Sequence, residues 1–202
     1  MLYLSHETTW NCFRAGECLP YLYHGSEKLF HNEDQYFEFI LKYRLYIAPI
    51  ADTYAYCLLP NHFHLLLKFK SPEELRAHFI EVKDFDEVGY GKVLSKQMGK
   101  LFSSYAQWLN LKTERKGGLF MSGFKRKLVD NPDYFTQLVA YIHTNPIKHG
   151  LTDDLYGWTY SSFHAYTSMK NSQVKTDIIL DFFGGKDALV DFHQNYNEDL
   201  VE

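Results

Sequence analysis

Disulfide bridges, membrane spans and disorder all find little support in this sequence of 202 residues. Its three cysteines, Cys12, Cys18 and Cys57, are odd in number and show no C-x-x-C spacing. This excludes a disulfide framework or a zinc knuckle and favours the reducing cytoplasm. No apolar run approaches the ~20 residues that cross a bilayer, and no leader pattern follows Met1, so we expect neither secretion nor a membrane partner. With 46% hydrophobic and 23% charged residues, the composition is not that of a disordered chain.

Internal repeats, low-complexity tracts and long linkers are absent as well, and the length fits one domain with an elaboration. A compact chain of this size buries about 70% of the surface that its unfolded form exposes, so it needs no disulfide to be stable. We divide the chain into an unassigned segment 1–18, a main domain 19–150 and a helical C-terminal extension 151–202.

The net charge of −4 argues weakly against nucleic acid, but it averages over a strong asymmetry. Residues 91–128 contain nine cations and one anion, whereas residues 171–202 contain two cations and seven anions. A basic middle with an acidic tail is typical of a polyanion-binding surface on an otherwise ordinary protein. A lysine-rich helix that only faces solvent explains the same charges equally well.

Hydrophobic periodicity and turn residues predict an alternation of strands and helices. The predicted order is strand 19–24, helix from Glu33, strand 53–59, strand 62–69, helix 91–111, strand 119–129 and a helix from Asn131 to about Thr144. The last helix should end there because a residue before proline, here Asn145, is disfavoured in the helical region. This order is typical of an α+β fold, a ferredoxin-like split βαβ sandwich with an antiparallel sheet and helices on one face. Beyond Gly150 we expect mostly helix, at 161–170 and 187–196.

Two histidines, His62 and His64, lie in a predicted strand with one residue between them. Side chains alternate along a strand, so both imidazoles should leave one face while Phe63, Leu65 and Leu67 leave the other. Two imidazoles at this separation can converge on one divalent cation. Two partly exposed histidines of a hairpin, with no ligand, are the alternative.

A second group of polar residues ends the helix that begins at Asn131. Tyr141 and Asn145 are four residues apart and share one helical face beside an apolar stripe. Taken alone, this tyrosine also fits the edge of a core, and the asparagine fits a helix stop. His143 and His149 fit exposed residues of the helix end.

The two groups together resemble a known family. Residues 59–66 (LPNHFHLL), followed by 141–146 (YIHTNP) and 148–151 (KHGL), are similar to the tyrosine HUH transposases of the insertion-sequence 200-like group. The match is best with the branch associated with repetitive extragenic palindromes (REP). Residues 158–163 (WTYSSF) and 182–186 (FFGGK) support it, and the resemblance covers roughly residues 19 to 193.

The resemblance implies a function and a role for each matching residue. The main domain would be a catalytic domain that nicks and rejoins single-stranded DNA, as in DNA transposition. Tyr141 would be the nucleophile that forms a 5′-phosphotyrosine intermediate, and His62, His64 and Asn145 would hold Mg²⁺ or Mn²⁺. The partner would be single-stranded or hairpin DNA, bound by a monomer or a homodimer. The basic residues assigned to DNA binding are Lys96, Lys100, Arg115, Lys116, Lys125, Arg126 and Lys127.

Two other functions stay open from the sequence. A non-catalytic relative of the same fold would bind DNA hairpins or single strands with an idle site. A zinc hydrolase built on the histidine pair would need a nearby general acid or base, and no carboxylate occurs in a suitable motif.

Overall fold

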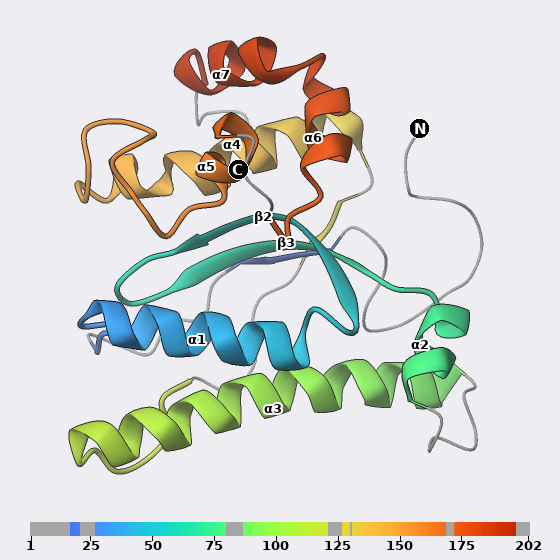
Figure 1. The fold of residues 1–202 in the computed structure, drawn as a ribbon, viewed down its shortest axis with the longest axis vertical. Helices are drawn as coiled ribbons and strands as arrows, with labels where there is room; N and C mark the ends of the chain where they lie inside the picture. The colour runs from blue at the N-terminus through green and yellow to red at the C-terminus, as the bar shows by residue number, and fades with distance from the viewer. Residues whose placement is uncertain are drawn as a thin grey trace.

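A four-stranded antiparallel sheet forms the middle of the molecule in the computed structural model, which describes residues 17–20, 27–79, 87–120, 127–129, 131–168 and 172–196 (Figure 1). The strands are β1 (Glu17–Pro20), β2 (Ala51–Leu58), β3 (Phe63–Phe69) and β4 (Lys127–Leu128), in the spatial order β2-β3-β1-β4. β2 and β3 form the predicted hairpin. The rest of the predicted first and fourth strands, 21–24 and 121–126, lies outside the described residues.

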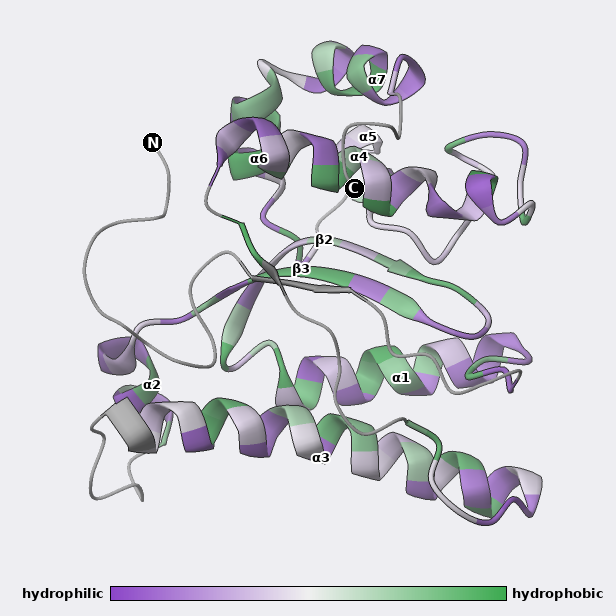
Figure 2. Cartoon of the chain, turned by 180° about the vertical axis from the view of Figure 1, so that it is seen from behind, coloured by the Kyte–Doolittle hydropathy of each residue, from purple (hydrophilic) through white to green (hydrophobic). Residues whose placement is uncertain are grey.

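Two long helices cover one face of this sheet. α1 (Glu33–Tyr46) begins where the Asn32 side chain accepts a hydrogen bond from the Gln35 backbone N–H, as a helix-capping asparagine does. α3 (Glu87–Thr113) packs against α1, and the short α2 (Pro72–His78) lies between β3 and α3 along the chain. The hydrophobic core on this side includes Phe39, Phe63 and Leu101. Hydrophobic and hydrophilic residues alternate along α1 and α3 (Figure 2), as expected of helices with one buried face.

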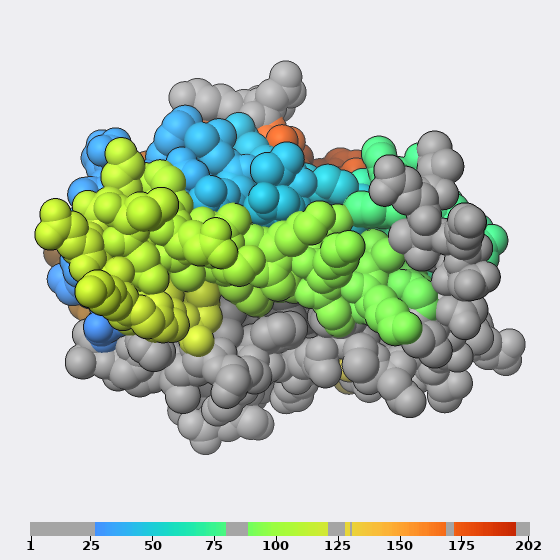
Figure 3. Space-filling model, turned by 90° about the horizontal axis from the view of Figure 1, so that it is seen from below, coloured from blue at the N-terminus to red at the C-terminus, as the bar shows by residue number. Residues whose placement is uncertain are grey.

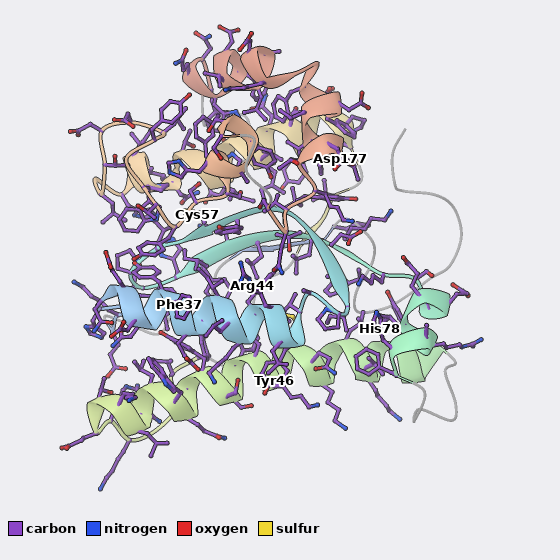
Figure 4. All side chains as sticks on the ribbon, in the orientation of Figure 1. Phe37, Arg44, Tyr46, Cys57, His78 and Asp177 are labelled. Atoms are coloured by element: carbon purple, nitrogen blue, oxygen red, sulfur yellow. The ribbon has the colours of Figure 1, made fainter. Side chains whose placement is uncertain are left out.

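The other face of the sheet is covered by α4 (Pro132–Lys148), together with α5 (Phe163–Thr167), α6 (Thr176–Phe183) and α7 (Lys186–Gln194) (Figure 1). A second core forms here and contains Leu66, Ile142 and Cys57, which is labelled in Figure 4. The predicted α+β class and element order are confirmed, but helices occupy both faces instead of one. The reason is visible in β3, where consecutive leucines, residues 65–67, send apolar side chains to both faces, and each face must be buried.

The helix that begins at Asn131 is longer than predicted. α4 continues through Asn145 and Pro146 to Lys148, so the expected end near Thr144 is wrong. Proline removes one backbone donor, but the last turns stay closed because the His149 and Leu151 N–H groups donate to Asn145 and Pro146 carbonyls. Ile142 and Pro146 are buried, so packing outweighs the lost hydrogen bond.

The C-terminal extension also completes the sheet at its β2 edge. Backbone N–H groups of Leu58 and Ser162 donate to Tyr160 and Tyr56 carbonyls, each at 2.9 Å. Further along the strand, Thr53 forms a parallel bridge with Val174. The extension is therefore hydrogen-bonded into the main domain. Across the described residues, no helix is both long and apolar enough to span a membrane.

Candidate active site between β3 and α4

The histidine pair sits at the start of β3. His62 immediately precedes the strand, where its carbonyl accepts a hydrogen bond from the Leu59 N–H, and His64 is the second strand residue. Their ring centroids are 5.1 Å apart, and both side chains are buried. Phe63 and Leu65 point to the opposite face, into the core under α1 and α3. The predicted side-chain alternation is confirmed, and it turns the His64 imidazole toward α4.

α4 brings Tyr141 and Asn145 to the same place. The half-buried Tyr141 ring lies edge-on to the His64 ring, with centroids 5.4 Å apart. One helical turn further on, Asn145 is buried, and its Nδ2 donates to the Tyr141 carbonyl at 2.6 Å. The Asn145 side chain also interacts with the His64 imidazole, and this interaction by itself raises the pKa of His64. The structure thus unites all four residues that the sequence motifs singled out for chemistry.

Burial keeps both histidines neutral at neutral pH. It lowers the pKa of His62 to about 4, with a further contribution from the charge of His149. Burial likewise lowers the pKa of His64 to about 3, because the ring is enclosed and charged neighbours oppose a second cation. A neutral imidazole retains a lone pair on one ring nitrogen, which is the form that binds a metal ion.

Three neighbours of this site were missed by the sequence analysis. Asn61 Oδ1 lies 2.8 Å from His62 Nδ1, so Nδ1 carries the proton and Nε2 carries the lone pair. The exposed His149 ring is 5.0 Å from the His62 ring. Lys148 Nζ lies 5.7 Å from the centroid of the Tyr141 ring. Helical spacing could have indicated Lys148 and His149, because residues seven and eight positions after Tyr141 lie on the same helical face.

The donor set fits a divalent cation of intermediate hardness. It offers two neutral imidazoles and the carboxamide of Asn145, whose Nδ2 is turned to the Tyr141 carbonyl. Mn²⁺ and Mg²⁺ accept mixed nitrogen and oxygen ligands, Mn²⁺ with the better affinity for nitrogen. Within the part of the chain that the structure describes, no group of three or more His, Cys, Asp or Glu side chains is placed to hold a metal. The amide is therefore needed to complete a protein-derived set of three ligands.

The basic residues assigned to DNA binding are spread over the molecule. Lys96 and Lys100 are exposed on α3, on the side of the sheet opposite α4. The Arg115 guanidinium forms an ion pair with Glu27 and donates to the Gly117 and Gly118 carbonyls, so it holds a loop in place. These residues do not join the histidine and tyrosine cluster.

The four other assigned cations follow α3 in the sequence. Lys116 is exposed just after α3. The backbone of Lys127, in β4, pairs with that of Cys18 in β1. Lys125 and Arg126 lie outside the described residues.

A buried chain of hydrogen bonds crosses α4 on the side away from Tyr141. His143 Nδ1 lies 2.8 Å from His193 Nε2, and His143 Nε2 lies 2.7 Å from Ser162 Oγ. His193 Nδ1 in turn donates to the Leu189 carbonyl at 2.7 Å. The expectation of exposure holds for His149 but is wrong for His143, because α7 and the 161–162 segment, unpredictable from local sequence, close over it.

Comparisons with known proteins point in one direction. No family model matches the chain. A Haemophilus influenzae protein named as a REP-associated tyrosine transposase is 26% identical over 141 residues, which cover 68% of this chain and 69% of that protein. A solved REP-associated tyrosine transposase, bound to a REP hairpin, matches with a TM-score of 0.54 and 18% identity over 81% of this chain and 86% of the other. The resemblance found in the sequence motifs is thus confirmed: this chain is similar to the REP-associated tyrosine transposases in sequence and in fold.

Proposed function

We propose that this protein nicks and rejoins single-stranded DNA through a 5′-phosphotyrosine intermediate on Tyr141, with the help of a divalent metal ion. The observation that carries the proposal is the contact between the Tyr141 ring on α4 and the His64 ring on β3, with His62 beside it. A phenol next to two neutral imidazoles places a nucleophile and a candidate metal site at one point.

The reaction is a transesterification at a DNA phosphate. The Tyr141 oxygen attacks phosphorus and loses its proton, a P–O bond to the tyrosine forms, and the bond to the 3′ oxygen of the neighbouring nucleotide breaks. That oxygen takes up a proton and leaves as a 3′-hydroxyl. The energy of the phosphodiester is kept in the tyrosyl ester, so the reverse reaction rejoins a strand without ATP.

Each residue of the site has a task in this scheme. His62, His64 and Asn145 would hold the cation, which supplies Lewis-acid polarisation of the phosphoryl oxygen and is worth several kcal/mol in such reactions. Asn61 fixes the ring orientation and tautomer of His62. The ammonium of Lys148, beside the Tyr141 ring, adds positive charge where the phosphate must lie.

The proposed DNA partner is a hairpin with a single-stranded flank. The similar solved structure contains a REP hairpin, and the sequence similarity to a REP-associated transposase supports the same class of substrate here. The asymmetric charge, with nine cations in residues 91–128, is consistent with a polyanionic partner.

The decisive experiment is adduct formation. Purified protein is incubated with labelled single-stranded hairpins taken from the DNA that flanks its gene, with Mn²⁺, with Mg²⁺ or with chelator, and the products are separated in SDS. We expect a metal-dependent, SDS-resistant protein–DNA band. Tyr141→Phe should abolish the band and leave hairpin binding unchanged, because only the phenolic oxygen is removed.

The same experiment separates enzyme from binding protein. Tyr134→Phe, on the same helix but outside the site, serves as the matched control and should form the adduct normally. Hairpin binding without an adduct at any metal concentration would favour the non-catalytic alternative. A tyrosyl adduct that persists in Tyr141→Phe would show that the nucleophile has been misassigned.

A further inference from the structure

Three lysines form an inclined row on the outer face of α3. Lys92, Lys96 and Lys100 are spaced by four residues, and all three are exposed. At 1.5 Å per residue the row extends about 12 Å along the helix. α3 runs across the whole width of the face that Figure 3 shows, with its outer side toward the viewer.

Among the described residues, these three cations have no oppositely charged partner. Other basic side chains are paired: Lys42 with Glu38 and Lys175 with Asp52. In contrast, none of the three ammonium groups on α3 makes an ion pair or hydrogen bond with another residue that the structure describes. Like charges four residues apart destabilise a helix, and a bound polyanion would remove this repulsion.

The residues between the lysines have small or polar side chains. Ser95, Gly99 and Ser103 are exposed on the same side of α3, and a Cβ added at Gly99 would meet nothing within 4 Å. Short side chains let a partner backbone approach the helix closely, while the lysine ammonium groups reach around it. The row contains no apolar side chain that could enter a lipid layer, which argues against a membrane surface as the partner.

We propose that the lysine row of α3, defined as Lys92, Lys96 and Lys100, binds the phosphate backbone of a double-stranded DNA stem. The inference rests on the proposed function in one respect, namely that DNA is the partner. About 12 Å of duplex axis carries roughly three to four phosphates on one strand, which matches three lysines. The contacts go to phosphates alone, so this surface contributes affinity and orientation but no sequence specificity.

The lysine row and the candidate active site lie on opposite sides of the sheet. α3 packs on α1 against one face of the sheet, whereas α4, the helix that carries Tyr141, covers the other face (Figure 1). A short single strand at the candidate active site does not need α3, whereas a folded substrate with a duplex stem can engage it. Loss of the row should therefore weaken binding of stems far more than it slows nicking of short single strands.

The test compares two variants that change the net charge by the same amount. The first replaces Lys92, Lys96 and Lys100 by Gln, whose helix propensity is similar. The control replaces Lys28, Lys175 and Lys186 by Gln as well, and none of these three belongs to α3. Binding of a fluorescent 20-base-pair hairpin is measured by anisotropy from 50 to 300 mM KCl.

For the α3 variant we expect at least a tenfold loss of affinity at low salt. The slope of log affinity against log salt concentration should also be smaller by about 2 to 3, because each phosphate contact contributes about 0.9. The control should lose little of either.

The outcomes distinguish this inference from the proposed function. Equal affinity and salt slope in the α3 variant and wild type, with normal nicking, would overturn the proposed role of the lysine row and leave the proposed nicking activity standing. Loss of stem binding in the α3 variant, with no adduct from wild type, would support the role of the lysine row and overturn the proposed nicking activity. Binding to vesicles with anionic lipids that depends on the same lysines, without duplex binding, would assign the surface to membranes and overturn the proposal.

Discussion

At the scale of single residues, the most informative contact is between Asn61 and His62. The Asn61 oxygen accepts a hydrogen bond from His62 Nδ1, which leaves the lone pair of the ring on Nε2. Partners of this kind orient metal-binding histidines and are needed almost as much as the histidines themselves. Asn61 therefore belongs to the site although it touches neither Tyr141 nor the expected position of the phosphate.

This contact leads to a prediction about metal affinity. Asn61→Ala should weaken Mn²⁺ binding by about 10- to 100-fold, because His62 loses the acceptor that sets its tautomer. Asn61→Asp retains an acceptor and should keep most of the affinity. Titration calorimetry with Mn²⁺ measures both variants directly, without DNA. Equal Mn²⁺ affinity for Asn61→Ala and wild type would contradict the assigned role.

The site residues could be named from the sequence because each belongs to a short motif with a fixed local geometry. Strand alternation fixes the shared direction of His62 and His64, and helical spacing fixes Tyr141 relative to Asn145. Sequence reasoning failed where the partner is distant in the chain. Arg115 meets Glu27 across 88 positions, and His143 meets His193 across 50, and neither contact leaves a local pattern.

At the scale of elements, α4 is held from both sides. One side presents Tyr141 and Asn145 to β3, and the other is fixed to α7 through His143 and His193. A single direction of donation satisfies the whole chain with neutral rings: Ser162 to His143, His143 to His193 and His193 to the Leu189 carbonyl. The rotation of α4 about its axis, which aims the tyrosine, is thereby tied to the C-terminal extension.

His193→Ala should reveal the strength of this connection. It removes a buried ring that stacks on His143 at 5.0 Å and leaves the His143 Nδ1 proton unsatisfied. We expect the free energy of unfolding to fall by about 2–4 kcal/mol in urea denaturation. His78→Ala, at an exposed position labelled in Figure 4, is the control and should change it by less than about 0.5 kcal/mol. A loss as small as that of the control would show that α7 contributes little.

The errors in the predicted elements share one physical origin. The end of α4 and the number of covered sheet faces depend on burial, which overrides local preferences such as the effect of Pro146 on Asn145. The sequence contained a usable hint in the three consecutive leucines of β3, residues 65–67, which indicate a strand buried on both sides. The positions of α5 to α7 over α4 depend on tertiary contacts that no periodicity encodes.

At the scale of the whole molecule, buried histidines make stability depend on pH. Burial lowers the pKa of His193 to about 4 and that of His143 well below its ordinary value. The unfolded chain, with a histidine pKa near 6.5, therefore binds protons that the folded chain does not. The free energy of unfolding should fall as the pH drops below about 6.5 and keep falling until about 4.

The predicted magnitude can be measured by urea denaturation at pH 7.5 and pH 5.0. His193 alone should account for a loss on the order of 2 kcal/mol at pH 5.0, and the neutral rings of His62, His64 and His143 add to it in the same direction. His193→Ala should show a smaller drop between the two pH values than wild type. Equal stability of the wild type at both pH values would contradict the buried, neutral state of these rings.

The pairing of β2 with the 160–175 segment has a consequence for how the chain behaves when it is cut short. β2 is the outermost strand of the sheet, and residues 160–162 and 174–175 occupy much of its hydrogen-bonding edge. A truncation after Gly150 would leave these groups open to strands of other molecules, and such bare edges promote aggregation. The extension thus protects this edge from intermolecular strand addition, and a shortened version of the protein is expected to precipitate before the proposed nicking could be assayed.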